Sequence, residues 1–285
     1  MNLELIADYN CIVGEGPMWH PLENAVYWAD IPQGRIFRYD PGSDQHGLMF
    51  ESGEVGGFTV QADGSLLLFM GGGAVATLRN GELQYHIREI AEERRSRFND
   101  VIADPAGRVF CGTMPSPDHL GSLYRLDTDG SITKVLGDIG ISNGMGFTPD
   151  AKQMYFTDSP THNIYIFDYD IESGELSNRR VFVNTGENDG IPDGMTVDAD
   201  GYVWSARWDG SSLVRYSPEG EQVNRIWFPA RKVSSVVFGG EDFTDMYVTT
   251  AGGEDKTGEG PGAGCLYRLN VGVKGKAEYL SRVGI

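Results

Sequence analysis

The sequence predicts an all-β fold, a six-bladed β-propeller with four antiparallel strands per blade, occupying residues 1–285 as one domain. One phrase occurs six times: a small or polar residue, an Asp or Gly turn, and two strands of aromatic and β-branched residues. The copies begin 41, 43, 44, 50 and 41 residues apart, and a four-stranded blade takes roughly 40 to 50 residues. Helical periodicity is nearly absent, so we expect a short helix within residues 82–95 alone.

Each copy begins at a residue that we call its anchor. The first strand of a propeller blade lines the central channel, so residues at this position converge on one axis from distant parts of the chain. The anchors are Glu15, Gly56, Asn99, Asn143, Asp193 and Ser234.

A turn follows the first strand of each copy. Asp63-Gly64 supplies a glycine for positive φ, and Pro149-Asp150 supplies a preset first turn residue. The second strands are expected at residues 26–28, 66–68, 109–110, 154–156, 202–204 and 246–248. The third strands are expected at residues 36–39, 75–78, 123–126, 164–167, 213–216 and 266–269. To close the ring, we expect the termini to share one blade through strands at residues 3–6 and 278–280.

Net charge and cysteines limit the partners and the compartment. Asp and Glu number 41 against 23 Lys and Arg, a formal net charge of −18 that should repel nucleic acid and anionic lipid. Cys11, Cys111 and Cys265 are widely spaced, as expected of reduced packing thiols. Residues 1–8 lack a signal-peptide pattern, and the longest apolar run, residues 66–70, is too short to span a bilayer. We expect a cytoplasmic monomer or weak homo-oligomer without nucleic-acid or membrane partners.

Four anchors carry oxygen on their side chains, namely Glu15, Asn99, Asn143 and Asp193. Two carboxylates and two amides suit one hard divalent cation, calcium first, with magnesium, manganese, zinc or iron as alternatives. The opposing interpretation is that Asn143 and Asp193, each followed by glycine, are ordinary turn residues. Their coincidence with the phase of the repeat favours the cation, which would also offset repulsion between Glu15 and Asp193.

Arg97 lies two residues before the Asn99 anchor. It could form a surface ion pair with Glu92 or Glu93, or donate hydrogen bonds to an oxygen-rich ligand in the channel. The five histidines share no ligand spacing, and no Gly-x-Ser-x-Gly motif marks a serine nucleophile.

Six short segments, in order along the chain, resemble the signature segments of the gluconolactonase/regucalcin (senescence marker protein) family, bacterial sugar lactonase type. They are Glu15-Gly16-Pro17 with Trp19, Arg97-Phe98-Asn99-Asp100, Gly112-Thr113-Met114, Ser142-Asn143-Gly144, Pro192-Asp193-Gly194-Met195 and Phe238-Gly239-Gly240. This resemblance implies hydrolysis of a sugar lactone, such as a glucono-, xylono- or arabinono-lactone, to the aldonic acid.

The resemblance also implies roles for particular residues. Glu15, Asn143 and Asp193 would be the metal ligands, Asn99 a further ligand that also meets substrate, and Arg97 a donor to sugar hydroxyls. Asp193 would be the general base for water. Two alternatives stay open: a phosphotriesterase on the same propeller and metal site, and a calcium-binding propeller without catalysis.

The segment of residues 115–122 looks shorter than the loop that covers the sugar in vertebrate members of this family. Asp118 or His119 is a candidate to cover the substrate in its place.

Overall fold

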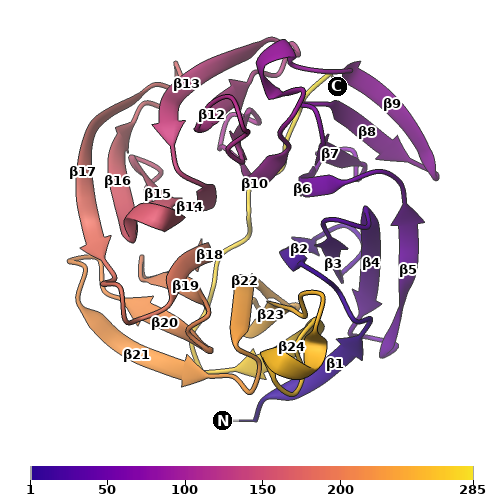
Figure 1. Cartoon of the computed structure of the whole chain (residues 1–285), viewed down its shortest axis with the longest axis vertical. Helices are drawn as coiled ribbons and strands as arrows, with labels where there is room; N and C mark the ends of the chain where they lie inside the picture. Colours follow the sequence, from indigo (N-terminus) through magenta and orange to yellow (C-terminus); the bar gives the residue numbers. More distant parts are fainter. Residues whose placement is uncertain (1, 285) are drawn as a thin grey trace.

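The computed structural model describes residues 2–284, in which six four-stranded antiparallel sheets form a ring (Figure 1). The fold is the six-bladed β-propeller that the repeat predicts. Each anchor lies on the innermost strand of its sheet, and the second and third strands of every copy form within one residue of where they were expected.

From the innermost strand outward, the first three blades are β2 Gly14–His20, β3 Ala25–Asp30, β4 Arg35–Asp40 and β5 Gln45–Glu51; β6 Val55–Val60, β7 Leu66–Met70, β8 Val75–Arg79 and β9 Glu82–Ile87; β10 Phe98–Ala103, β11 Val109–Thr113, β12 Gly121–Leu126 and β13 Ile132–Ile139. The next two are β14 Ser142–Phe147, β15 Gln153–Asp158, β16 Asn163–Tyr169 and β17 Leu176–Asn184; β18 Ile191–Val197, β19 Val203–Trp208, β20 Ser212–Tyr216 and β21 Gln222–Trp227. The last is β22 Lys232–Gly239, β23 Asp245–Ala251, β24 Cys265–Asn270 and β1 Glu4–Asp8. Short 3₁₀ turns lie at η1 Ala91–Glu93, η2 Ser159–Thr161 and η3 Lys256–Glu259.

The hydrophobic core lies between neighbouring blades. Side chains alternate between the two faces of a strand, so each sheet can pack against the blade before it and the blade after it. Each of the six buried clusters among the described residues accordingly combines two adjacent blades. Burial decreases outward, from the fully buried β6 to the largely exposed β5.

The N-terminal strand closes the ring, as expected. β1 pairs antiparallel with β24, from Glu4 opposite Arg268 to Asp8 opposite Cys265. The expected strand at residues 278–280 is wrong: these residues belong to no strand, because β1 already occupies the outer edge of the last blade.

The C-terminal tail, residues 271–284, instead crosses the ring near its axis, as the yellow trace in Figure 1 shows. Isolated bridges join Gly275 to Asp198 and Ser281 to Gln61. The Ser281 and Thr59 hydroxyls are 2.8 Å apart. The tail therefore ties the fifth blade to the second.

The expected helix within residues 82–95 is also wrong. Residues 82–87 form β9, the outer strand of the second blade, and residues 91–93 form a single 3₁₀ turn. β9 is polar because an outermost strand faces solvent, and its polarity resembles that of a solvated helix.

All three cysteines are buried free thiols. Burial raises the pKa of Cys11 and of Cys265 to about 12, which keeps both thiols protonated near neutral pH. Within residues 2–284, no helix combines the length and apolar character needed to cross a membrane.

We predict that Gly275→Ala lowers the free energy of unfolding by about 1–3 kcal/mol, because a Cβ at this position would overlap the Phe238 ring. Urea unfolding followed by tryptophan fluorescence measures the effect. Gly137→Ala is the control: a Cβ there meets nothing within 4 Å, so the change should stay within about 0.5 kcal/mol. Equal midpoints for the two variants would contradict a tail held by this contact.

Candidate functional site

Each inner strand loses its regular register at or beside its anchor. The irregularities lie between residues 15 and 18, 55 and 57, 98 and 101, 143 and 145, 192 and 195, and 233 and 235. Such a bulge leaves a residue out of the ladder and redirects its side chain. The repeat therefore places each anchor at the same level of its blade, and redirects the side chain of every anchor except Gly56.

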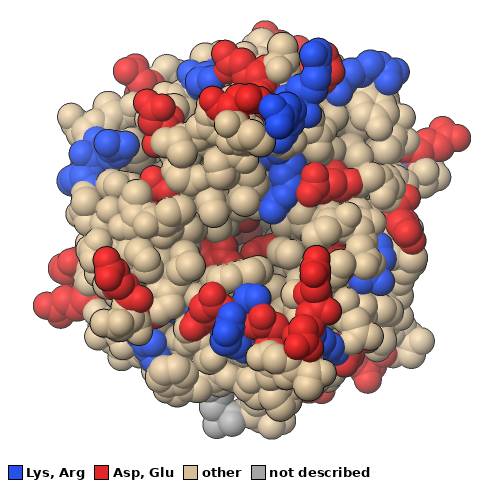
Figure 2. Space-filling model, viewed as in Figure 1, with Lys and Arg blue, Asp and Glu red and all other residues tan. Residues whose placement is uncertain are grey.

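A cavity of about 350 Å³ lies where these strands converge. Figure 2 shows acidic atoms within a hollow at the centre of one face. All five residues predicted from the sequence line the cavity, together with residues that the sequence analysis missed. Its lining is Val13, Glu15, Arg97, Asn99, Met114, Ile141, Asn143, Ser159, Ile191, Asp193 and Trp208.

The remaining two anchors do not line this cavity. Gly56 leaves no room for a side chain, since a Cβ there would overlap the Phe98 carbonyl group. The Ser234 hydroxyl donates to the Gly14 carbonyl, 2.6 Å away, and so joins the last blade to the first.

Two buried carboxylates stand in the cavity. Glu15 and Asp193 are 4% and 5% exposed. Burial, followed by the charges of Asp193 and Asp100, raises the pKa of Glu15 well above its usual value. Burial and the charge of Asp100 likewise raise the pKa of Asp193. Holding both groups ionised is costly without a cation, and a divalent ion would remove that cost.

Asn99 connects the amide and guanidinium groups of the site. Its Oδ1 accepts a hydrogen bond from Arg97 Nη1 at 2.7 Å. Its Nδ2 donates to the Ser142 carbonyl at 2.9 Å and to Asn143 Oδ1 at 3.2 Å. The Asn99 oxygen thus already accepts a hydrogen bond from a positively charged group, the Arg97 guanidinium. The Asn99 amide nitrogen connects the third blade to the fourth.

Arg97 is held from the side of the second blade. Its Nε lies 3.3 Å from Glu54 Oε1, and Nη1 also donates to the Phe98 carbonyl at 2.9 Å. These contacts fix the guanidinium plane at the wall of the cavity, where it can donate to a ligand.

The ion pair between Arg97 and Glu92 or Glu93 is wrong. Glu92 pairs with Lys134, and Glu93 accepts a hydrogen bond from the Tyr124 hydroxyl at 2.8 Å. Both acids belong to the turn η1, and the bulged strand carries Arg97 toward the channel and away from them.

Three of the six lining residues that the sequence analysis missed share one position in the repeat. Val13, Ile141 and Ile191 each lie two residues before an anchor, as Arg97 does. Side chains two residues apart share one face of a strand, so this position forms a second ring beside the anchors. Glu54, which holds Arg97, lies in the same position of the second copy. The phase of the repeat could have identified Val13, Ile141, Ile191 and Glu54, whereas Met114, Ser159 and Trp208 do not occupy this position.

Neither candidate for covering the substrate lines the cavity. Asp118 pairs with Arg95 at 3.0 Å. The His119 ring nitrogens contact the backbone carbonyls of Leu120 and Glu92. Met114, directly before this segment, lines the cavity instead.

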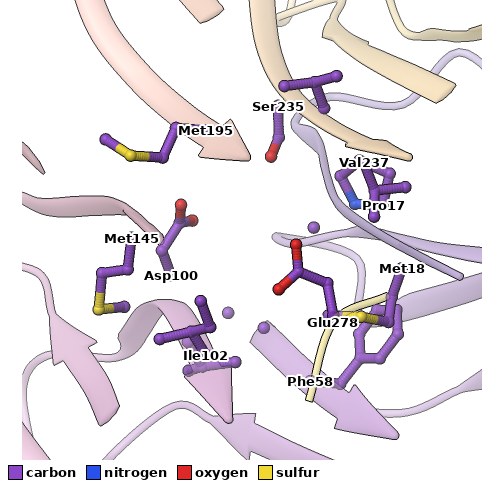
Figure 3. A pocket seen from close by; sticks show the side chains of 15 residues that line it. Pro17, Met18, Phe58, Asp100, Ile102, Met145, Met195, Ser235, Val237 and Glu278 are labelled. Atoms are coloured by element: carbon purple, nitrogen blue, oxygen red, sulfur yellow. The ribbon is translucent and has the colours of Figure 1, made fainter. Parts of the chain in front are cut away.

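A smaller space of about 50 Å³ continues along the channel. Figure 3 shows that Asp100 and Glu278 reach into it, together with Ser235, Met145 and Met195. Burial raises the pKa of Asp100 to about 7, although Arg97 opposes this shift. Glu278 comes from the C-terminal tail, so the tail closes the acidic floor of the channel.

The donor set fits a hard cation through its oxygens. No group of three or more His, Cys, Asp or Glu side chains in residues 2–284 is arranged to hold a metal. A site here therefore depends on asparagine oxygens beside Glu15 and Asp193, and such oxygens suit calcium or magnesium.

Known proteins resemble this chain over most of its length. Residues 13–252 match the family model described as the SMP-30/Gluconolactonase/LRE-like region. The chain belongs to this family. Pentonolactonase XacC of Haloferax volcanii is 47% identical over 290 residues, covering 99% of both chains. Human regucalcin is 33% identical, covering 98% of both chains.

A solved structure of the same family has the same fold. The calcium-binding protein regucalcin from Agrobacterium tumefaciens superposes with a TM-score of 0.91 at 25% identity, covering 99% of this chain and 98% of that one. The shared fold thus extends over nearly the whole of both chains.

We predict that, in metal-free protein, Glu15→Gln raises the free energy of unfolding at pH 8. The pKa of Glu15 is higher in the folded chain, so ionisation destabilises the fold as pH rises from the unfolded pKa of about 4.3. The advantage of the variant should therefore shrink as pH falls toward that value. Urea midpoints across this pH range test it, with Glu82→Gln on the exposed edge of β9 as control. A variant less stable than wild type at pH 8 would contradict the prediction.

Proposed function

We propose that this protein is a metal-dependent hydrolase that opens sugar lactones to aldonic acids. The observation that carries the proposal is a cavity holding two buried carboxylates, two asparagines and a tethered arginine at the axis of the propeller. The identity to a pentonolactonase over the full chain supports the substrate class.

Glu15, Asn143 and Asp193 would hold one divalent cation, calcium first among the candidates. A bound cation supplies Lewis-acid stabilisation of the negative charge that develops on the lactone carbonyl oxygen. Asn99, whose oxygen already accepts from Arg97, would contact the substrate and serve as a further ligand.

The side chains of this chain account for binding and proton transfer. Arg97, fixed by Glu54 and Asn99, donates hydrogen bonds to the sugar hydroxyls. Asp193 accepts a proton from the attacking water as the water oxygen bonds to the carbonyl carbon. The bond between the carbonyl carbon and the ring oxygen then breaks, the ring oxygen takes up the proton held by Asp193, and the aldonic acid leaves.

Two alternative functions, a phosphotriesterase and a calcium-binding propeller without catalysis, each have one observation in their favour. The apolar lining, which includes Met114, Ile141 and Trp208, is the kind of wall that an apolar phosphotriester needs. A calcium-binding propeller without catalysis agrees with the description of the Agrobacterium relative. Arg97 favours the polyhydroxylated lactone over both.

We predict that Asp193→Asn lowers kcat for lactone hydrolysis by about 10²- to 10⁴-fold, the usual contribution of a general base. Acid release from a panel of aldonolactones, with a phosphotriester beside them, measures this. Chelation should abolish the wild-type activity, and added calcium, magnesium or manganese should restore it. Asp118→Asn, on the exposed loop, is the matched control and should stay near wild type. Lactone hydrolysis that survives both chelation and Asp193→Asn would overturn the proposed function.

We predict that Arg97→Lys lowers kcat/KM by about tenfold or more, mainly through KM, because an ammonium cannot keep the contacts to Glu54 and Asn99 while donating to a sugar. Steady-state kinetics on the best lactone measures it. Arg95→Lys is the control, since Arg95 pairs with Asp118 on the surface. An unchanged KM in Arg97→Lys would remove Arg97 from the substrate contacts.

A further inference from the structure

Two consecutive hydrogen bonds determine which way the oxygen and the nitrogen of the Asn143 amide point. Asn143 Nδ2 donates to the Ser159 hydroxyl at 3.0 Å. The Ser159 hydroxyl donates to the Pro192 carbonyl at 2.6 Å. Both side chains are buried, Asn143 at 6% and Ser159 at 3% exposure.

The number of protons makes this chain directional. A hydroxyl has one proton, and a backbone carbonyl can only accept, so the Ser159 proton belongs to the bond with Pro192. Toward Asn143, Ser159 can therefore only accept. The amide must turn its NH₂ group to Ser159, and its oxygen faces the opposite side.

Asn143 and Ser159 both line the cavity, and the Asn143 oxygen faces Asn99, another lining residue. Asn143 Oδ1 accepts from Asn99 Nδ2 at 3.2 Å, which requires the same orientation. A carbonyl oxygen has two lone pairs, so Oδ1 can accept from Asn99 and still coordinate a cation. With the amide reversed, its nitrogen would face the cation, and an NH₂ group is no ligand for calcium or magnesium.

Ser159 is itself held in place from two strands. It opens the turn η2 directly after β15, and its backbone N–H donates to the Ile141 carbonyl at 3.2 Å. Pro192, its acceptor, immediately precedes Asp193 on β18. The chain of hydrogen bonds thus runs from the backbone beside one proposed ligand to the side chain of another.

We propose that Ser159 is a positioning residue that orients the Asn143 amide so that its oxygen faces the metal. This inference rests on the proposed function, because it presumes a cation in the cavity. It differs from a purely structural role, in which Ser159 satisfies buried polar groups and does not control the ligand.

The test uses the full chain stripped of metal and titrated with Mn²⁺, with free Mn²⁺ followed by electron paramagnetic resonance. Ser159→Ala should weaken Mn²⁺ binding about 10- to 100-fold, the usual effect of losing a residue that orients a ligand. Ser159→Thr keeps the hydroxyl and should restore most of the affinity. Ser159→Cys, a weak donor and acceptor of similar size, should weaken binding as alanine does while keeping the packing.

The decisive comparison repeats Ser159→Ala in a protein that also carries Asn143→Asp. A carboxylate presents oxygen on both sides, so its ligand atom does not depend on Ser159. Adding Ser159→Ala to Asn143→Asp should therefore change Mn²⁺ affinity by less than about twofold. Should Ser159→Ala fail to fold, as shown by circular dichroism, Ser159→Cys replaces it in both backgrounds.

The outcomes are distinct. Loss of affinity in the wild-type background without loss in the Asn143→Asp background supports the positioning role. Equal losses in both backgrounds, or no loss in either, overturn it. Failure of the wild-type chain to bind Mn²⁺ or Ca²⁺ overturns the metal-dependent function itself, before any variant is considered.

Discussion

Six inner strands can share one axis only where their backbones approach more closely than side chains ordinarily allow. Glycine makes this possible directly after two of the anchors. A Cβ at Gly144 would lie 2.5 Å from the Asp193 carbonyl oxygen, and one at Gly194 would lie 2.5 Å from Ser235 Cβ. The spacing of β14, β18 and β22, and with it the spacing of every polar group in the cavity, depends on these missing side chains.

The same convergence concentrates negative charge that the fold does not neutralise by itself. Burial raises the pKa of Glu15, Asp193 and Asp100, and the charge of Asp100 raises the pKa of the other two further. Arg97 is the positively charged residue in the lining of the larger cavity. Backbone bulges hold these carboxylates in place, so their positions do not rely on ion pairs. A fold that places charge against its own stability is typical of a functional site.

Much of this arrangement could be predicted from the sequence because the repeat gives the length of a blade and also the place of each residue within its blade. Glu15, Asn99, Asn143 and Asp193 occupy the same position in different copies, and the channel follows from that alone. The errors have physical causes of another kind. The tail at residues 278–280 competes with β1 for one sheet edge, and such a competition leaves no local signature. Residues 82–87 are polar because an outer strand is solvated, and Ser159 lies in a turn outside the repeated phrase.

The closure of the ring by β1 also affects the order in which the blades can fold. The pair of Glu4 and Arg268 joins residues 264 positions apart, so the last blade cannot form until β24 has been synthesised. Until then the outer edge of β24 is absent, so β1 is an unpaired strand of the nascent chain. Contacts of such long sequence separation form slowly. The channel is therefore complete only once β24 has been made and has paired with β1.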